Sequence, residues 1–137
     1  MKKLLFGVSD TEECRRAIDT IISLFGNQNI ELTLLHVTPD TIIHAESGLI
    51  DYESIADTQQ EESIKILNSF YEAFKNQSFS CHKILKSGNP IDVVLEIAPN
   101  YDLLIIGSSE SSLLHRIFNS HQNSFVNASP ISVLVAK

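Results

Sequence analysis

A short run of apolar residues that stops at a glycine constrains the fold of this chain more than any other feature. Leu103 to Ile106 are consecutive aliphatic residues, and Gly107 follows them at the head of a serine-rich stretch. A short apolar run bounded by a turn signal is typical of a strand buried on both faces, as in a parallel sheet. Such sheets bind ligands beyond the carboxyl ends of their strands, where the strand order reverses. The sequence therefore predicts a site at Gly107 before it indicates what the site binds.

Strand-like and helix-like segments alternate along the rest of the chain. Strands are predicted at 3–8, 30–37, 79–85, 103–106 and 131–136, and helices at 12–25, 51–75, 90–98 and 113–126, with a loop at 41–50. This alternation indicates a βαβ series, and its right-handed crossovers leave few topologies. We predict a flavodoxin-like, doubly wound α/β fold in which residues 1–137 form one domain. Its five-stranded parallel sheet has the strand order 3-2-1-4-5 and carries helices on both faces.

Polar residues mark the starts of two of these helices. Ser9, Asp10 and Thr11 precede the first helix, where side-chain oxygens can accept from free backbone N–H groups. Asn89 and Pro90 stand at the N-cap and the first helical position of the third helix. We therefore expect Ser9 and Asp10 to serve in helix capping.

Apolar spacing predicts which helical faces are buried. In the long second helix, a period of 3.6 residues selects Ile55, Ile64, Leu67, Tyr71 and Phe74. The third helix should bury Ile91, Val94, Leu95 and Ala98. The polar segment 57–62 should face solvent, with a partner surface as the alternative.

Charge and N-terminal pattern narrow the class of partner. The chain has 17 acidic and 10 basic residues, a net charge of −7, which argues against nucleic acid or an anionic membrane as the main partner. The apolar run at the N-terminus is too short for a signal peptide, and no run has the length of a membrane span. We expect a cytoplasmic protein.

The side chains that carry catalysis or bind metals do not form recognisable motifs. The five histidines lack metal-ligand spacing, and no Gly-x-Ser-x-Gly motif is present. Cys14 lies on the apolar face of the first helix and should be buried, whereas Cys81 in an edge strand is the better candidate for a reactive thiol. A response-regulator receiver, whose acidic corner Ser9 and Asp10 could resemble, is disfavoured because its third strand should end in a phosphoacceptor aspartate. Leu85-Lys86-Ser87 stands there instead.

Five landmarks in a fixed order resemble the universal stress protein family. They are Lys3 to Glu13, Leu35-His36-Val37, Gly88-Asn89-Pro90, Tyr101 to Ser108, and Ser132 to Val135. The resemblance covers the whole chain. It implies the same flavodoxin-like fold and, commonly, a homodimer joined through the last strand, here Ile131 to Ala136.

Some members of that family bind ATP, and the residues implied by the resemblance are only partly present here. Val37 and Gly107 match the pattern of the binders. Ser9 replaces the aspartate that follows the first strand and holds the adenosine part. Glu110 replaces the second glycine of the phosphate loop, and Asn119-Ser120 replaces its final Gly-Ser/Thr at a spacing one residue shorter.

A carboxylate in a phosphate loop opposes binding. Two like charges about 4 Å apart repel by about 4 kcal/mol at an effective dielectric constant of about 20, or roughly three decades of affinity. Glu110 would exert this repulsion if its side chain stayed near the phosphates. The candidate nucleotide-binding residues are therefore a degenerate set: Ser9, Val37, Gly107, Ser108, Ser112, Asn119 and Ser120.

Three hypotheses remain open at this point. The first is a dimeric, non-enzymatic regulatory or stress-response module with weak or no ATP binding, acting through protein contacts. The second is an adenine-nucleotide sensor, binding ATP with Mg²⁺ or AMP, with at most slow hydrolysis. The third is a binding site for a smaller ligand, such as AMP or an uncharged metabolite, which tolerates Glu110 better than a triphosphate does.

Overall fold

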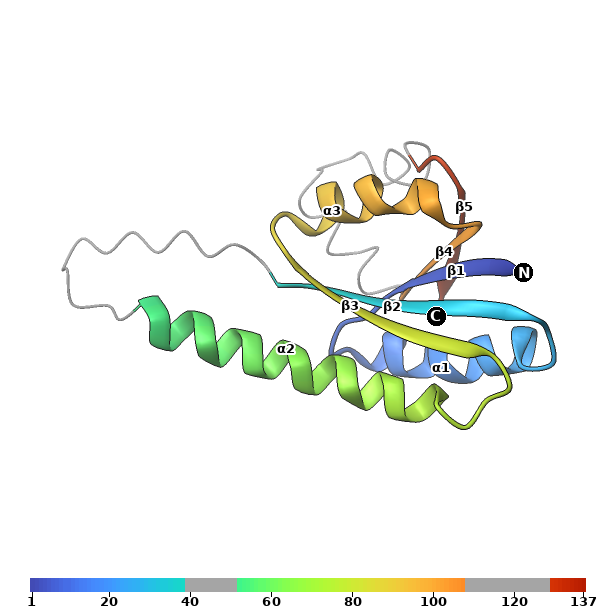
Figure 1. Cartoon of the computed structure of the whole chain (residues 1–137), viewed down its shortest axis with the longest axis horizontal. Coiled ribbons are helices and arrows are strands. Elements are labelled where there is room, and N and C mark those ends of the chain that lie inside the picture. The colour runs from blue at the N-terminus through green and yellow to red at the C-terminus, as the bar shows by residue number, and fades with distance from the viewer. Residues whose placement is uncertain (39–51, 108–128) are drawn as a thin grey trace.

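Five parallel strands form one sheet in the order β3-β2-β1-β4-β5 (Figure 1). The computed structural model describes residues 1–38, 52–107 and 129–137. The strands are β1 (Lys2–Gly7), β2 (Ile30–Thr38), β3 (Ser80–Ser87), β4 (Leu103–Gly107) and β5 (Ser132–Ala136). The helices are α1 (Glu12–Phe25), α2 (Tyr52–Phe74), α3 (Pro90–Ile97) and the short 3-10 turn η1 (Ala98–Asn100). The predicted flavodoxin-like class and strand order are confirmed.

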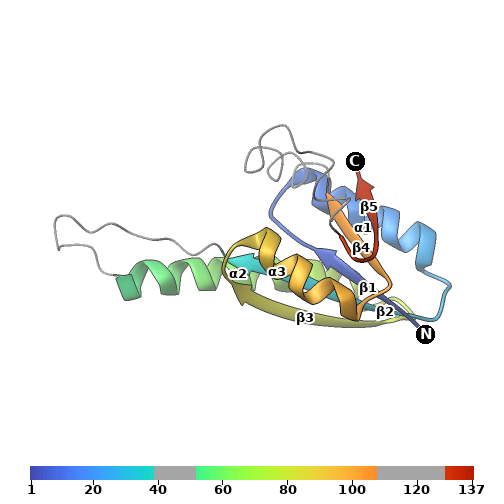
Figure 2. The ribbon, with the colours of Figure 1, turned by 90° about the horizontal axis from the view of Figure 1, so that it is seen from above.

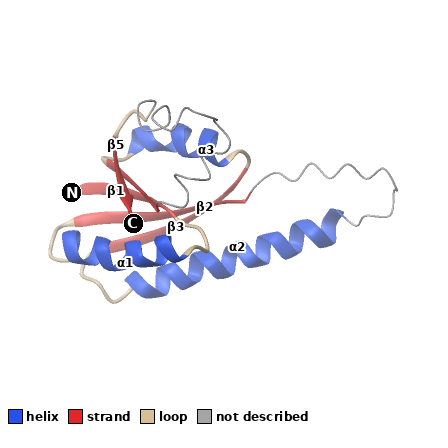
Figure 3. Cartoon of the chain, turned by 180° about the vertical axis from the view of Figure 1, so that it is seen from behind, coloured by secondary structure: helices blue, strands red, loops and turns tan. Residues whose placement is uncertain are grey.

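Helices cover both faces of the sheet, as the views from above and from behind show (Figures 2 and 3). Helices α1 and α2 pack on one face, and α3 packs on the other. The first face holds the larger core, in which the ring of Phe6 from β1 meets Phe70 and Phe74 of α2 edge-on. The second core surrounds Leu5, Leu104 and Ile91. Because neighbouring residues of a strand point to opposite faces, Leu5 and Phe6 serve different cores.

The buried face of α2 differs from the predicted one. Phe70, which the predicted set omits, is fully buried, and Ile64 is 42% exposed. The face that meets the sheet runs through Ser63, Leu67, Phe70 and Phe74. Ile64 lies about 100° around the helix from Ser63 and so turns away from the sheet. The prediction for Ile64 was wrong because its spacing to Leu67 is also helical and the polar Ser63 did not suggest a core position. Leu67 and Phe74 are buried as expected, and the side chain of Ile55 lies outside the described part.

The predicted start of α3 is confirmed. The Asn89 side chain accepts from the backbone N–H of Ile91 at 3.0 Å and of Asp92 at 3.3 Å, and Pro90 occupies the first turn. Gly88 precedes them with φ of 137°, a conformation that favours glycine. These contacts fix where the chain turns from β3 back across the sheet.

Two predicted segments fall outside the described residues, namely the loop at 41–50 and the helix at 113–126. Within the described ranges, no helix is both long and apolar enough to cross a membrane.

Candidate functional site

The reversal of strand order places the candidate site at the carboxyl ends of β1 and β4. The chain leaves β1 toward β2 on one side, whereas β4 pairs with the other side of β1. Adjacent parallel strands whose connections run in opposite directions leave a crevice at their carboxyl ends. The residues that the structure describes there are the turn from Val8 to Thr11 after β1, the first turn of α1, and Gly107 at the end of β4.

Ser9 and Gly107, two of the predicted site residues, meet at Cys14. The Ser9 Oγ lies 3.5 Å from the Cys14 Sγ. A Cβ added at Gly107 would lie 2.8 Å from the same sulfur and 3.1 Å from the Cys14 backbone nitrogen. The first turn of α1 therefore packs directly against the end of β4, and glycine is required there by packing alone. Cys14 is fully buried, as its place on the apolar face of α1 predicted.

The N-cap of α1 is Thr11, whose side chain accepts from the Cys14 N–H at 3.2 Å. Of the three residues predicted to supply caps, only this one does so. Ser9 lies beside the cap, with its Oγ 3.5 Å from the Thr11 Oγ1. Asp10 instead forms an ion pair with Arg15, 2.8 Å between Oδ1 and Nη2. The capping role expected of Ser9 and Asp10 is thus corrected, because the N-cap is Thr11, one residue after Asp10 and two after Ser9.

Val37, the third described site residue, lies apart from this pair. It lies on the neighbouring strand β2, two residues after Leu35, which pairs with Gly7 in the sheet. Its side chain packs against the core that α3 covers, whereas Cys14 belongs to the core on the α1 and α2 side. The structure therefore brings Ser9 and Gly107 together at Cys14. It places the side chain of Val37 on the opposite face of the sheet from Cys14. Ser108, Ser112, Asn119 and Ser120 lie outside the described residues.

Charges near the crevice are paired within the chain. Glu12 and Glu13 occupy the first turn of α1, and Arg16 contacts them at 3.2 Å and 3.9 Å. Carboxylates are stabilised at a helix N-terminus, where the N–H groups leave a partial positive charge. The same carboxylates reduce the attraction of that terminus for a phosphate.

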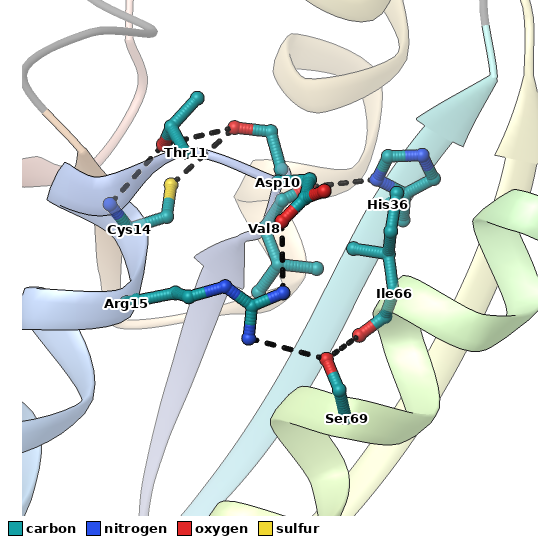
Figure 4. A network of polar contacts seen from close by, with 9 residues as sticks. Val8, Asp10, Thr11, Cys14, Arg15, His36, Ile66 and Ser69 are labelled. Atoms are coloured by element: carbon teal, nitrogen blue, oxygen red, sulfur yellow. Dashed lines mark hydrogen bonds and ion pairs between the residues drawn. The ribbon is translucent and has the colours of Figure 1, made fainter.

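A polar network that no sequence pattern indicated connects this edge to α2 (Figure 4). Arg15 contacts Asp10 and also donates from Nη1 to the Ser69 Oγ at 3.4 Å. The His36 Nδ1 lies 2.7 Å from the Val8 carbonyl oxygen, so this nitrogen carries the proton and donates it. Arg15 and Ser69 are 54 positions apart in the chain, and only the packing of α1 against α2 makes them neighbours.

Cys81, the predicted better candidate for a reactive thiol, is the more accessible of the two cysteines, because it is only partly buried and Cys14 is fully buried. Partial burial in β3 raises the pKa of the Cys81 thiol to about 11, and the nearby Lys83 ammonium lowers it by less. A thiol with a raised pKa is mostly protonated at neutral pH, and the thiolate is the nucleophile. Both cysteines are free.

We expect alkylation of Cys81 by iodoacetamide to be slow at pH 8, where about one thiol in a thousand is ionised. The rate should rise roughly tenfold for each pH unit and level off only near pH 11, because the thiolate fraction grows until the pH passes the pKa. Mass spectrometry of the two cysteine-containing peptides separates Cys81 from the buried Cys14. A plateau near pH 9 would contradict the effect of burial.

Among the described residues, no group of three or more histidine, cysteine, aspartate or glutamate side chains is placed to hold a metal ion. The chemistry that the described part of the site supports is binding through hydroxyl and backbone groups.

Comparison with known proteins gives consistent matches over the full length. The model of the universal stress protein family matches residues 1–137. A Helicobacter pylori protein named universal stress protein is 47% identical over 135 residues, which cover 98% of each chain. A universal stress protein family protein from Arabidopsis thaliana, solved with AMP bound, superposes with a TM-score of 0.73 at 19% identity, covering all of this chain and 92% of the other. A universal stress protein in complex with cAMP gives 0.71 at 17% identity, covering 99% and 97%.

Proposed function

The chain belongs to the universal stress protein family, and on that premise we propose that it is a cytoplasmic, single-domain, dimeric regulatory module without enzymatic turnover and with weak or no binding of ATP. The observation that carries this proposal is the position of Ser9. Family members that bind ATP have an aspartate at this position, after the first strand. Here a hydroxyl occupies it and lies within 3.5 Å of Thr11 and Cys14, so no carboxylate is present at residue 9 to hold the adenosine part of a nucleotide.

Two sequence features support the same proposal. Glu110 places a carboxylate in the segment that would wrap the phosphates, and the first turn of α1 adds Glu12 and Glu13. Each of these charges repels a triphosphate.

The proposed dimer uses the last strand. Strand β5 is the outermost strand on its side of the described sheet, and Val135 on it is 36% exposed. An edge strand with an exposed apolar side chain can pair with a second copy of itself. Light scattering on the purified protein should give twice the chain mass, and a monomer at high micromolar concentration would contradict this part of the proposal.

Isothermal titration of the dialysed protein tests the nucleotide part. We expect no binding of Mg-ATP in the low micromolar range. Low-micromolar affinity would contradict the proposal and favour a nucleotide sensor.

Two single variants identify the cause of weak binding. Glu110→Gly should tighten Mg-ATP binding, because it removes the carboxylate, and should change AMP binding less. Ser9→Asp should tighten the binding of Mg-ATP and of AMP equally, because it restores an acceptor for their common adenosine part. If neither variant changes any affinity, the two departures from the family pattern are not what weakens the site.

A second candidate function is a site for an adenine nucleotide with one phosphate. The observation that favours it is that two proteins of the same fold hold AMP and cAMP. A ligand with one phosphate suffers less repulsion from Glu110 than a triphosphate does. AMP binding that is tighter than Mg-ATP binding in the same titrations would support this candidate, and the absence of measurable AMP binding would exclude it.

A further inference from the structure

Two polar bridges join the carboxyl edge of the sheet to a single segment of α2, residues 63–69. The first runs from the turn after β1, through Arg15, to Ser69. The second runs from the end of β2, where the Thr38 Oγ1 lies 2.9 Å from the Ser63 Oγ. Both bridges end within two turns of the same helix.

In the first bridge, the guanidinium of Arg15 contacts three groups, two of which, Asp10 and Ser69, are drawn in Figure 4. Arg15 binds the Asp10 carboxylate at 2.8 Å, donates to the Ser69 Oγ at 3.4 Å, and stands 5.0 Å from the centre of the Phe70 ring. Ser69 donates its own proton to the Ile66 carbonyl at 2.8 Å, which leaves its oxygen free to accept from Arg15. The fork of a guanidinium allows this division, since different nitrogens serve Asp10 and Ser69.

In the second bridge, a buried hydroxyl finds its partner on a strand end. Ser63 is only 4% exposed, and Thr38 supplies its hydrogen bond. The same strand end is tied to β1, because His36 donates to the Val8 carbonyl one residue before Ser9. The turn that carries Ser9 is therefore joined to α2 along two separate routes.

The first bridge is too exposed to be important for holding the fold. The side chains of Arg15 and Asp10 are 45% and 63% exposed, and exposed ion pairs shift an equilibrium only a few fold. Helix α2 is already held by Leu67, Phe70 and Phe74, which are buried in the core. A contact of this strength couples the two separately anchored elements weakly, by no more than the few-fold shift that an exposed pair permits.

We propose that Arg15 is a positioning residue that couples the turn carrying Ser9 to helix α2, so that a ligand or partner acting on either side changes the other. This coupling exists without any bound nucleotide. Its test is therefore made on the ligand-free protein, and its failure is distinguishable from a failure of the nucleotide proposal.

The first test is amide hydrogen exchange, followed by NMR on the full chain. Arg15→Met should raise the exchange rates of the Thr11 and Cys14 amides and those of residues 66–70 on the order of threefold, the size that an exposed pair permits. Arg16→Met is the matched control, because Arg16 is the next residue of α1 but pairs only with Glu12 and Glu13 of its own helix among the described residues. Equal exchange in the two variants would overturn the proposal.

The second test separates coupling from a purely local effect. Ser69→Ala lies on α2, yet it should raise the exchange of the Thr11 and Cys14 amides roughly twofold, and this effect should vanish in the Arg15→Met background. Asn68→Ala is the control, since Asn68 accepts from Lys83 of β3 and not from Arg15. No effect of Ser69→Ala across the interface, or an equal effect in both backgrounds, would show that Arg15 does not couple the two elements.

Discussion

Replacing Phe70 by alanine is expected to lower the free energy of unfolding by about 3–5 kcal/mol, the range for a large aromatic side chain lost from a core. Phe70 is fully buried, and its ring meets that of Phe6 at a centroid distance of 5.8 Å and an angle of 82°. The substitution removes this contact and leaves a cavity between α2 and the centre of the sheet. Urea unfolding followed by circular dichroism measures the change.

Ile64→Ala is the matched control on the same helix. Its side chain is 42% exposed, so its loss should cost less than about 1 kcal/mol. If Phe70→Ala does not fold, Phe70→Leu keeps an apolar side chain and should show a smaller loss of the same sign. Equal destabilisation by Phe70→Ala and Ile64→Ala would contradict the burial of α2 described here.

Replacing Gly107 by alanine is expected to lower the free energy of unfolding by about 1–3 kcal/mol, as overpacking does. The new methyl would lie 2.8 Å from the Cys14 Sγ and 3.1 Å from the Cys14 backbone nitrogen. Either α1 must move away from β4 or the end of β4 must bend. The loss should appear in the absence of any ligand, which distinguishes packing from a role of Gly107 in phosphate binding.

The double variant Gly107→Ala with Cys14→Ala tests the contact itself. Removing the sulfur relieves the closest approach, whereas the contacts to the Cys14 nitrogen and Cα at 3.1 and 3.4 Å remain. We therefore expect the double variant to lose less stability than the sum of the two single variants. Strict additivity, or an unchanged stability of Gly107→Ala, would contradict the close packing of α1 on β4.

The sequence predicted the fold well because its signals were local and consistent. The apolar run Leu103 to Ile106 and the cap formed by Asn89 each specify an element within a few residues. Alternation of strands and helices then leaves few topologies, since crossovers are right-handed. The class, the strand order and the start of α3 are confirmed for these reasons.

The candidate site was predicted less completely, because side-chain partners far apart in the chain are not written in a local pattern. Ser9 and Gly107 were selected as ligand residues, yet what joins them in the structure is their common contact with Cys14. Aspartate is a residue type common at helix N-caps, but Asp10 forms an ion pair with Arg15 instead. The role of Val37 and the four candidates after Gly107 remains a prediction.

What the sequence by itself determined is the alternation of elements, the position of the glycine that ends β4, and the departure from the family's nucleotide pattern at Ser9 and Glu110. Only the tertiary structure decided that α2 buries Phe70 rather than Ile64 and that Cys81 is partly buried, which raises the pKa of its thiol. It also decided that Arg15 reaches Ser69. Periodicity and capping act within a few residues, whereas these properties depend on which helix face the sheet covers and on surfaces that meet only when distant segments pack together.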